Sequence, residues 1–485
     1  MQTTAIARHP IATRTPLLPQ QVDAVTKLLP TRVGALFMEM GTGKSRTAIE
    51  LVRLRQHKIS KVVWFCPVSL KPTVQHEIFK HTTATAADVC VFNDKTNSRN
   101  LPACWWYVVG VESMSASNRV ALTVNRLIDD ETLVIVDESQ LIKGHKSMRT
   151  QRITVMSERA RYRLILTGTP ISQGIVDLYA QMRFLSPKIL GYRSYYSFAR
   201  NHLEYSEKYK GLIVRSHNSE WIAAKIKPYV YQVTKDECLD LPDKLYETRY
   251  VDMTSEQRRL YEQAKEEILT ADIEEFTSYT IFRLFTALQQ ISCGFWRRRY
   301  IDINEKVHKS LIEIPHQRVE MLLDTISSIP NDKKVIIWAK YHYDIEQIAA
   351  HLSEQYGADS VALFYGGIKQ NDRSIEVEKF RTHARFMIST PSCGGVGQTW
   401  NEAHYVIFYN NGFKYADRIQ AEDRNHRIGQ DHKVVYIDIR TDAGIDDRIS
   451  AALWSKSNAV SDFKKEVDQV KASSKNKLRE FVMQL

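Results

Sequence analysis

The chain lacks the sequence features that mark membrane-spanning, secreted and disordered proteins. No stretch of its 485 residues is apolar for long enough to cross a bilayer, and the first fifteen residues lack the continuous apolar segment of a signal peptide. Neither a tandem repeat nor a low-complexity linker is present. These absences predict a folded protein of the cytoplasm, or of the nucleus or host cytoplasm depending on its source, with no membrane partner.

Paired cysteines are also missing. The six cysteines lie far apart, without the close pairs that zinc sites use and without a secretory context that would favour disulfides. We therefore expect them to be reduced and mostly structural.

Acidic residues are in the minority. Lysine and arginine outnumber aspartate and glutamate by 67 to 56, which gives a net charge of +11 and favours a polyanionic partner. Hydrophobic residues at 43% and charged residues at 25% are ordinary for a globular protein. A chain of 485 residues is long enough for two or three domains, so an active site between lobes is possible.

Short β-branched runs alternate with helical patterns in both halves of the chain, which is typical of α/β units with buried parallel sheets. The spacing predicts an α/β fold with two similar lobes, residues 1–177 and 306–455, a mostly helical insertion and linker, residues 178–305, and a charged helical tail, residues 456–485. The predicted strands are Val33 to Met38, Lys61 to Cys66, Trp105 to Val109, Leu133 to Val136 and Tyr162 to Thr167 in the first lobe, and Lys334 to Trp338, Val361 to Phe364, Arg385 to Ser389, Tyr405 to Tyr409 and Val434 to Asp438 in the second.

A glycine-rich segment after the first predicted strand has the context of a phosphate-binding loop. Its sequence is Gly41-Thr42-Gly43-Lys44-Ser45, and it opens a helix. The glycines allow close approach of the backbone, Lys44 is suited to neutralise the β- and γ-phosphates, and the Ser45 hydroxyl is suited to ligate magnesium. Met38 stands where the strict motif has its first glycine. An ordinary structural loop is the alternative.

Two carboxylates follow the predicted strand Leu133 to Val136. Asp137 is a candidate magnesium ligand, and Glu138 is a candidate to orient and polarise the attacking water, as phosphoryl transfer requires. The alternative is a polar strand end, which is common on its own. The preceding Lys44 loop, at a suitable distance in the chain, favours the catalytic interpretation.

A third element, Gln420 to Gln430, contains two arginines three residues apart. We expect Arg424 and Arg427 to lie on one face of a helix and to reach the γ-phosphate as arginine fingers. A salt-bridged surface helix is the alternative.

In their order along the chain, from about Leu17 to Trp454, these segments resemble helicase superfamily two and, within it, the Swi/Snf-like ATPases. The ending of Asp423 to Gln430 is highly characteristic of that branch's sixth motif. Further segments that resemble family motifs are Leu18 to Gln21 for adenine reading, Phe65 to Leu70 for motif one-a, Leu166 to Ile171 for motif three and Ile388 to Thr399 for motif five.

The resemblance implies two RecA-like lobes that close on ATP and Mg²⁺ and grip double-stranded DNA, with forked or branched DNA left open as forms of this partner. It also implies that Gln21, Gly395, Gly397 and Gln420 contribute to the nucleotide site. One departure concerns Gln140, which stands where the branch usually has histidine. The contact from motif two to the second lobe is then expected to be made by an amide.

DNA in this family is gripped mainly through its backbone, so we expect little sequence preference. Two of the predicted contacts, Ser69 and Ser113, lie in the first lobe, and helix capping is the alternative role for each. Arg297, Arg298 and Arg299, flanked by aromatic residues in the insertion, suit phosphates and a base face, although such a charge run is often merely solvated. Besides these arginines, the predicted DNA contacts are Ser69, Lys71, Ser113, Ser389 and Thr390.

Taken together, the residues and the resemblance predict an ATP-dependent translocase or remodeller of double-stranded DNA. Two alternatives stay open: a strand-separating or annealing helicase, and an ATP-gated DNA-binding scaffold that moves little. Protein partners are left unassigned by the sequence.

Overall fold

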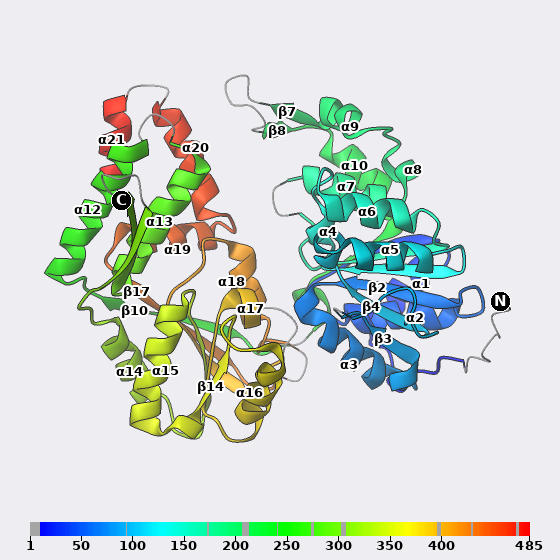
Figure 1. Ribbon diagram of the computed structural model, residues 1–485, viewed down its shortest axis with the longest axis horizontal. Coiled ribbons are helices and arrows are strands. Elements are labelled where there is room, and N and C mark those ends of the chain that lie inside the picture. The colour runs from blue at the N-terminus through cyan, green and yellow to red at the C-terminus, as the bar shows by residue number, and fades with distance from the viewer. Residues whose placement is uncertain are drawn as a thin grey trace. The chain divides into compact units, whose positions relative to one another are not determined.

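The computed structural model divides into two compact units, Met1–Asp240 (unit 1) and Leu241–Leu485 (unit 2), shown in Figure 1. Each unit is described by itself. The structure describes residues 10–93, 95–171, 174–205, 213–239, 241–272, 276–301, 307–394, 399–427, 430–471 and 475–485.

Unit 1 is built on a seven-stranded sheet in which all paired strands are parallel, with the order β3-β4-β2-β5-β6-β1-β9. Strands β1, β2 and β5 are buried along nearly their whole length because helices cover both faces of the sheet. The strands are β1 (Val33–Met38), β2 (Lys61–Cys66), β3 (Val89–Val91), β4 (Trp106–Gly110), β5 (Thr132–Asp137), β6 (Tyr162–Leu166) and β9 (Val230–Val233).

The longer helices of unit 1 connect these strands. Ser117 and Ser147 cap two of them, because each hydroxyl accepts a hydrogen bond from a free amide of the first helical turn. A short hairpin of β7 (Leu203–Tyr205) and β8 (Ile213–Ser216) lies among the last helices of the unit. The helices are α1 (Pro19–Leu28), α2 (Lys44–Arg55), α3 (Lys71–His81), α4 (Ser113–Ala116), α5 (Asn118–Leu127), α6 (Met148–Ser157), α7 (Val176–Leu185), α8 (Pro187–Leu190), α9 (Tyr195–His202), α10 (Ser219–Ile226) and α11 (Lys235–Cys238).

Unit 2 is built on a six-stranded parallel sheet with the order β10-β17-β16-β13-β15-β14. A separate antiparallel hairpin joins β11 (Phe295–Ile301) to β12 (Val307–Glu313). The strands of the large sheet are β10 (Lys244–Val251), β13 (Lys334–Trp338), β14 (Val361–Phe364), β15 (Phe386–Ser389), β16 (Ala403–Phe408) and β17 (Val434–Thr441). The helices are α12 (Ser255–Asp272), α13 (Ser278–Ser292), α14 (Arg318–Ser327), α15 (His342–Tyr356), α16 (Gln370–Thr382), α17 (Pro391–Gly394), α18 (Tyr415–Glu422), α19 (Gly444–Trp454), α20 (Ala459–Lys471) and α21 (Lys475–Met483).

Helices α12, α13, α20 and α21 gather at one end of unit 2 (Figure 1) and share an apolar core. Phe285 of α13, Phe463 of α20 and Val482 of α21 are all buried in it. The last helices of the chain are therefore packed elements, because their apolar faces complete a core with helices from residues 255–292. Within the part of the chain that the structure describes, no helix has the length and apolar character that crossing a bilayer requires.

The predicted α/β class with two parallel-sheet lobes is confirmed. Four strands, β1, β2, β13 and β14, have the predicted limits. The span 178–305 is divided between the units, since β9 pairs with β1 in the first sheet and β10 pairs with β17 in the second. Both are edge strands without the long apolar runs that marked the central strands.

Candidate nucleotide and nucleic-acid sites

The predicted phosphate loop lies between β1 and α2 in unit 1. Gly41 and Gly43 have φ angles of 83° and 97°, a left-handed backbone that favours glycine. A Cβ atom on Gly43 would lie 1.9 Å from Nε2 of Gln21, so a side chain at this position would displace that amide. The Lys44 ammonium donates to the carbonyl of Met38 at 2.9 Å. The loop is thus folded around its own lysine at the N-terminus of a helix, an arrangement that fits a phosphate chain.

Helix α1 braces this loop through two glutamines. Gln20 Nε2 donates to the carbonyl of Thr42 at 3.2 Å, and the buried Thr42 hydroxyl donates to the carbonyl of Glu39 at 2.7 Å. Gln21 Oε1 accepts from the Leu18 amide at 3.0 Å, which holds the glutamine against the loop. Ser45 is half-buried at the second position of α2. The predicted nucleotide-binding residues of unit 1 therefore lie together.

The two predicted carboxylates lie at the end of β5. Asp137 is buried, and this burial together with the neighbouring Glu138 raises the pKa of Asp137 to about 7, against the opposing effect of Lys44. The Glu138 amide donates to Asp137 Oδ1 at 2.9 Å, and Glu138 has a left-handed φ of 49°. Such strain in a non-glycine residue is typical of functional sites. The Asp137 carboxylate and Ser45 hydroxyl are oxygen donors of the kind that Mg²⁺ prefers.

Gln140 connects Glu138 to the segment predicted as motif three. Its Nε2 donates to Glu138 Oε2 at 2.6 Å, and its Oε1 accepts from the Thr167 hydroxyl at 2.7 Å. The Thr167 hydroxyl in turn accepts from the Thr169 amide at 3.0 Å. Within unit 1, the amide at position 140 thus bridges Glu138 and Thr167, and its contact to the second lobe stays a prediction.

A second amide bridge runs beside the first. The Ser139 hydroxyl donates to Gln181 Oε1 at 2.6 Å, and Gln181 Nε2 donates to the carbonyl of Pro170 at 2.9 Å. Gln181 was not singled out in the sequence, since a glutamine within a helix carries no local signal. Motifs two and three are therefore joined at two places.

The predicted DNA contacts of unit 1 follow two adjacent strands, β2 and β4. Ser69 is exposed and Ser113 is half-buried at the start of α4. Neither serine is an N-cap, because those positions are occupied by Pro67 and Glu112. The Lys71 ammonium donates to the carbonyl of Phe92 at 2.7 Å.

The two arginines of unit 2 lie in a turn, and the prediction that they share a helical face is wrong. Helix α18 ends at Glu422, two residues before Arg424. The helix does not continue because tertiary bonds take up the carbonyls of the turn: Trp400 N donates to Arg424 O at 2.8 Å, and Gln430 Nε2 donates to Asn425 O at 3.0 Å.

Within this turn, Arg424 Nε donates to the carbonyl of Gln420 at 3.0 Å, and an Arg427 guanidinium nitrogen donates to the Thr399 hydroxyl at 2.8 Å. Three predicted nucleotide or finger residues, Arg424, Arg427 and Gln420, thus lie within one short segment. Gly395 and Gly397 lie outside the described residues.

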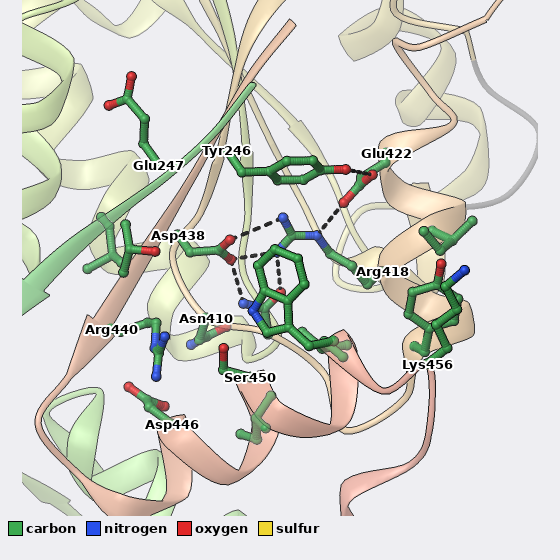
Figure 2. Close-up of a pocket in the computed structure, with 18 residues that line it drawn as sticks. Tyr246, Glu247, Asn410, Arg418, Glu422, Asp438, Arg440, Asp446, Ser450 and Lys456 are labelled. Atoms are coloured by element: carbon green, nitrogen blue, oxygen red, sulfur yellow. Dashed lines mark hydrogen bonds and ion pairs between the residues drawn. The ribbon is translucent and has the colours of Figure 1, made fainter. Parts of the chain in front are cut away.

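A buried ion-pair network holds α18 against the sheet. Figure 2 shows Arg418 between Asp438 and Glu422, and the Arg418–Glu422 pair is 2.7 Å long. Glu422 also accepts from Lys244 at 2.8 Å and from the Tyr246 hydroxyl at 3.0 Å. Burial raises the pKa of Glu422, but the cations Arg418 and Lys244 outweigh it and hold the pKa below its usual value. The network defines the floor of a pocket of about 220 Å³ between β10, β17, α18 and α19.

Ser389 differs from its predicted role. Its side chain is fully buried, and its hydroxyl donates to the carbonyl of Phe364 at 2.5 Å, so it is not on a surface that DNA can reach. The neighbouring Thr390 hydroxyl accepts from the Cys393 amide at 3.3 Å at the start of α17.

The arginine run lies in strand β11 of the antiparallel hairpin, although the sequence placed it in a mostly helical segment. Arg298 pairs with Glu267 at 2.5 Å and lies 5.4 Å from the centre of the Trp296 ring. Arg297 is exposed, and the side chain of Arg299 lies outside the described residues. Alternation along the strand therefore separates neighbouring arginines, and Arg298 has a carboxylate partner.

Comparisons with known proteins identify the family. The model of the SNF2-related domain matches residues 25–294, which is more than half of the chain. The chain belongs to the SNF2-related family. The helicase conserved C-terminal domain matches residues 317–429, so both units of this SNF2-related chain are covered by family models. The predicted Swi/Snf-like membership is confirmed.

Similar proteins come from bacteria and animals. An uncharacterized ATP-dependent helicase of Mycoplasma pneumoniae is 25% identical over 333 residues, which are 68% of this chain and 30% of the relative. The ATP-dependent helicase brm of Drosophila melanogaster is 24% identical over 466 residues, 88% of this chain and 27% of the relative. The SNF2-related chain thus spans about a third of the length of these relatives, or less.

Among solved structures, the Sulfolobus solfataricus SWI2/SNF2 ATPase core in complex with dsDNA is similar to this chain. It is 22% identical, and the alignment covers 97% of this chain and 98% of that chain with a TM-score of 0.42.

Proposed function

We propose that this SNF2-related chain is a DNA-dependent ATPase that uses ATP hydrolysis to move along double-stranded DNA. The observation that carries the proposal is the arrangement at the edge of the unit 1 sheet, where Lys44, Asp137 and Glu138 follow strand ends and Lys44 influences the pKa of Asp137. The names of the relatives, ATP-dependent helicases, support the same activity.

Each residue of this edge has a proposed role. Lys44 neutralises the β- and γ-phosphates, and Gln21, Gly41, Thr42 and Gly43 contribute to the nucleotide site. Glu138 orients and polarises the attacking water, held by its bond from Gln140 at 2.6 Å.

Ser45 and Asp137 are the proposed magnesium ligands. Magnesium, when bound, supplies positive charge to the phosphate oxygens. A cation at Asp137 also favours the ionised form of this buried carboxyl, whose pKa is raised to about 7.

The arginine turn of unit 2 completes the proposed chemistry. Arg424 and Arg427 stabilise the charge that develops on the γ-phosphate, and Gln420 contributes to the nucleotide site from the same segment. The ion pairs of Arg418 beneath this segment fix the end of α18, which precedes the turn by two residues.

Four exposed or half-buried residues remain the proposed DNA contacts: Ser69, Lys71, Ser113 and Arg297. Their hydroxyls and cations suit phosphate oxygens, which carry no sequence information. If these residues bind the DNA backbone, the Arg297→Ala variant loses one phosphate contact. The slope of the logarithm of the DNA-binding constant against the logarithm of the salt concentration then falls in magnitude by about one.

The Glu138→Gln variant tests the proposed chemistry. It keeps the shape of the side chain and removes the base, so ATP binding is retained while DNA-stimulated turnover falls on the order of a hundred-fold or more. The matched control is Glu131→Gln, an exposed glutamate at the start of the same strand. Wild-type turnover in the Glu138 variant would remove this residue from its role.

The nature of the track is tested by a ligand panel. ATPase rates are measured with duplex, single-stranded, forked and RNA ligands, followed by displacement of a triplex strand. Duplex stimulation with triplex displacement and no strand separation supports the translocase. Strand separation or annealing favours the helicase alternative, and ATP-dependent DNA binding without displacement favours the scaffold.

A further inference from the structure

A groove of about 490 Å³ lies between α5 and α6 on the surface of unit 1. The two helices contact one another and lie side by side in Figure 1. Its apolar lining consists of Ala121 and Leu122 from α5 and Val155 and Met156 from α6. This groove is separate from the phosphate loop and from the paired carboxylates, none of which lines it.

The rim of the groove is unusually apolar for a protein surface. Leu122 is 61% exposed and Val155 is 65% exposed. Met148 does not line the groove but lies two turns before Val155 on α6 and is 52% exposed. These side chains do not belong to the core-facing stripe, which uses Val120 and Val124 in α5. Neighbouring exposed apolar residues of this kind mark protein interaction sites.

The spacing of the lining suits a helical partner. On α5 the lining residues recur at intervals of three, four and seven positions, and on α6 at intervals of three and four, so each helix presents one continuous face to the groove. A third helix can lay an apolar stripe into the seam between two such faces, with ridges entering grooves.

The charged residues within the two helices are of one sign. Helices α5 and α6 together contain Arg119, Arg126, Arg149 and Arg152 and no acidic residue. The described bonds of Arg152 go to uncharged acceptors, the carbonyl of Met114 at 2.8 Å and Asn118 Oδ1 at 2.7 Å. Arg126 likewise donates to the Ser98 hydroxyl at 3.1 Å. Their positive charge is therefore not cancelled by these contacts.

We propose that the α5–α6 groove docks an amphipathic helix of a protein partner, one whose apolar stripe is flanked by aspartate or glutamate. The apolar lining accounts for the stripe, and the arginines account for the acidic flanks. A DNA backbone would satisfy the arginines but would leave Leu122 and Val155 against charged phosphates, so a protein helix fits the groove better.

The test uses the full chain and a labelled, designed helical peptide with leucines at positions i, i+3, i+4 and i+7 and glutamates beside them. Binding is followed by fluorescence anisotropy. The double variant Leu122→Ser/Val155→Ser is expected to weaken binding about ten-fold or more, because truncated central apolar anchors carry much of an interface's affinity. Ile375→Ser is the matched control, since Ile375 of α16 is 66% exposed and lies in the other unit.

Two further measurements keep the proposal falsifiable. A peptide with lysines in place of the glutamates is expected to bind about ten-fold more weakly. Equal binding of both peptides, or equal binding to the wild type and the double variant, overturns the proposal. Displacement of the peptide by duplex DNA, with DNA affinity lost in the double variant, assigns the surface to nucleic acid instead. A self-association abolished by the same substitutions assigns it to a second copy of the chain.

Discussion

The nucleotide edge of unit 1 and the arginine turn of unit 2 are held in place in different ways. In unit 1, Lys44 and Asp137 stand where a helix begins and a strand ends, and uncharged amides such as Gln140 connect the motifs. In unit 2, Arg424 lies in a turn beyond α18, and buried charges fix that helix.

The two regions differ in how much charge must be desolvated to hold the functional residues in place. The bridging side chains Gln140 and Gln181 are themselves neutral, so little desolvation of charge opposes a rearrangement of these two bridges around a nucleotide. Arg418 and Glu422 are buried ions, Asp438 is half-buried, and each depends on the others for its stability. The turn of unit 2 therefore follows a helix that ion pairs hold rigidly, which we call its rigid base. We expect substitutions in unit 2 to lower mainly stability and substitutions at the unit 1 edge to lower mainly turnover.

The largest expected effect is on the stability of unit 2. Arg418→Met leaves the buried Glu422 with Lys244 alone and the half-buried Asp438 without this arginine, which costs about 3–5 kcal/mol in the free energy of unfolding. Urea denaturation followed by circular dichroism measures this loss. In unit 1, Arg46→Met should cost less, because Glu50 keeps its pair with Arg53 at 2.5 Å.

An exposed ion pair supplies the control for this experiment. Arg259 pairs with Glu256 at 2.7 Å on the surface of α12, and Arg259→Met should leave the unfolding midpoint nearly unchanged. If Arg418→Met also unfolds at the wild-type midpoint, the network does not provide the rigid base, and the contrast between the two regions fails.

Asp344 of α15 in unit 2 resembles Asp137 of unit 1 in its environment. Both carboxyls are buried, and burial raises the pKa of each to about 7. Between the ordinary value of 3.8 and about 7, the folded protein retains the proton on Asp344 while the unfolded chain releases it. Stability from this group is therefore lost as the pH rises through that window.

Asp344→Asn should remove this pH dependence while keeping an oxygen that can accept from the Asn410 amide. The variant is expected to gain on the order of a few kcal/mol over the wild type at pH 8 and little at pH 4, measured by thermal or urea unfolding. Magnesium should stabilise the wild type and Asp344→Asn alike, but not Asp137→Asn. An equal gain at both pH values would contradict the assigned titration.

A smaller effect, on turnover, is expected at the amide bridge of unit 1. Gln140→Ala removes the 2.6 Å bond that orients Glu138 and the 2.7 Å bond from Thr167. Turnover should fall about ten-fold while the KM for ATP changes little, because the lost contact positions the base rather than the nucleotide. The control is Gln151→Ala, an exposed amide in the same unit. Parallel losses of kcat and ATP affinity would instead indicate a collapsed loop.

Much of the nucleotide edge could be predicted because each functional residue lies at the end of a strand or in the loop and helix start that follow one, and these strands are evident in the sequence. Lys44, Asp137 and Glu138 need no long-range information to be placed. The Gln140–Thr167 bond could not be predicted, since it depends on β5 pairing with β6 in the register that sets Asp137 opposite Leu166.

The arginine turn was harder to predict for the same physical reason. Spacing alone favoured a helix through Arg424 and Arg427, whereas bonds from Trp400 and Gln430 to carbonyls of this segment form the turn. Lys244, assigned by sequence to a linker, is 178 positions from its partner Glu422, and no local pattern contains that pairing.

The smallest expected effect is at Tyr246, which contributes a neutral hydrogen bond, and not an ion pair, to the network of unit 2. Tyr246→Phe removes only the 3.0 Å bond to Glu422, which keeps Arg418 and Lys244, so the loss is about 1 kcal/mol in the free energy of unfolding. Tyr250→Phe on the same strand, 63% exposed, is the control and should have no effect. Because the cations remain, turnover should stay near the wild-type rate. A large fall in turnover with unchanged stability would mean that Tyr246, rather than the ion pairs, positions the arginine turn.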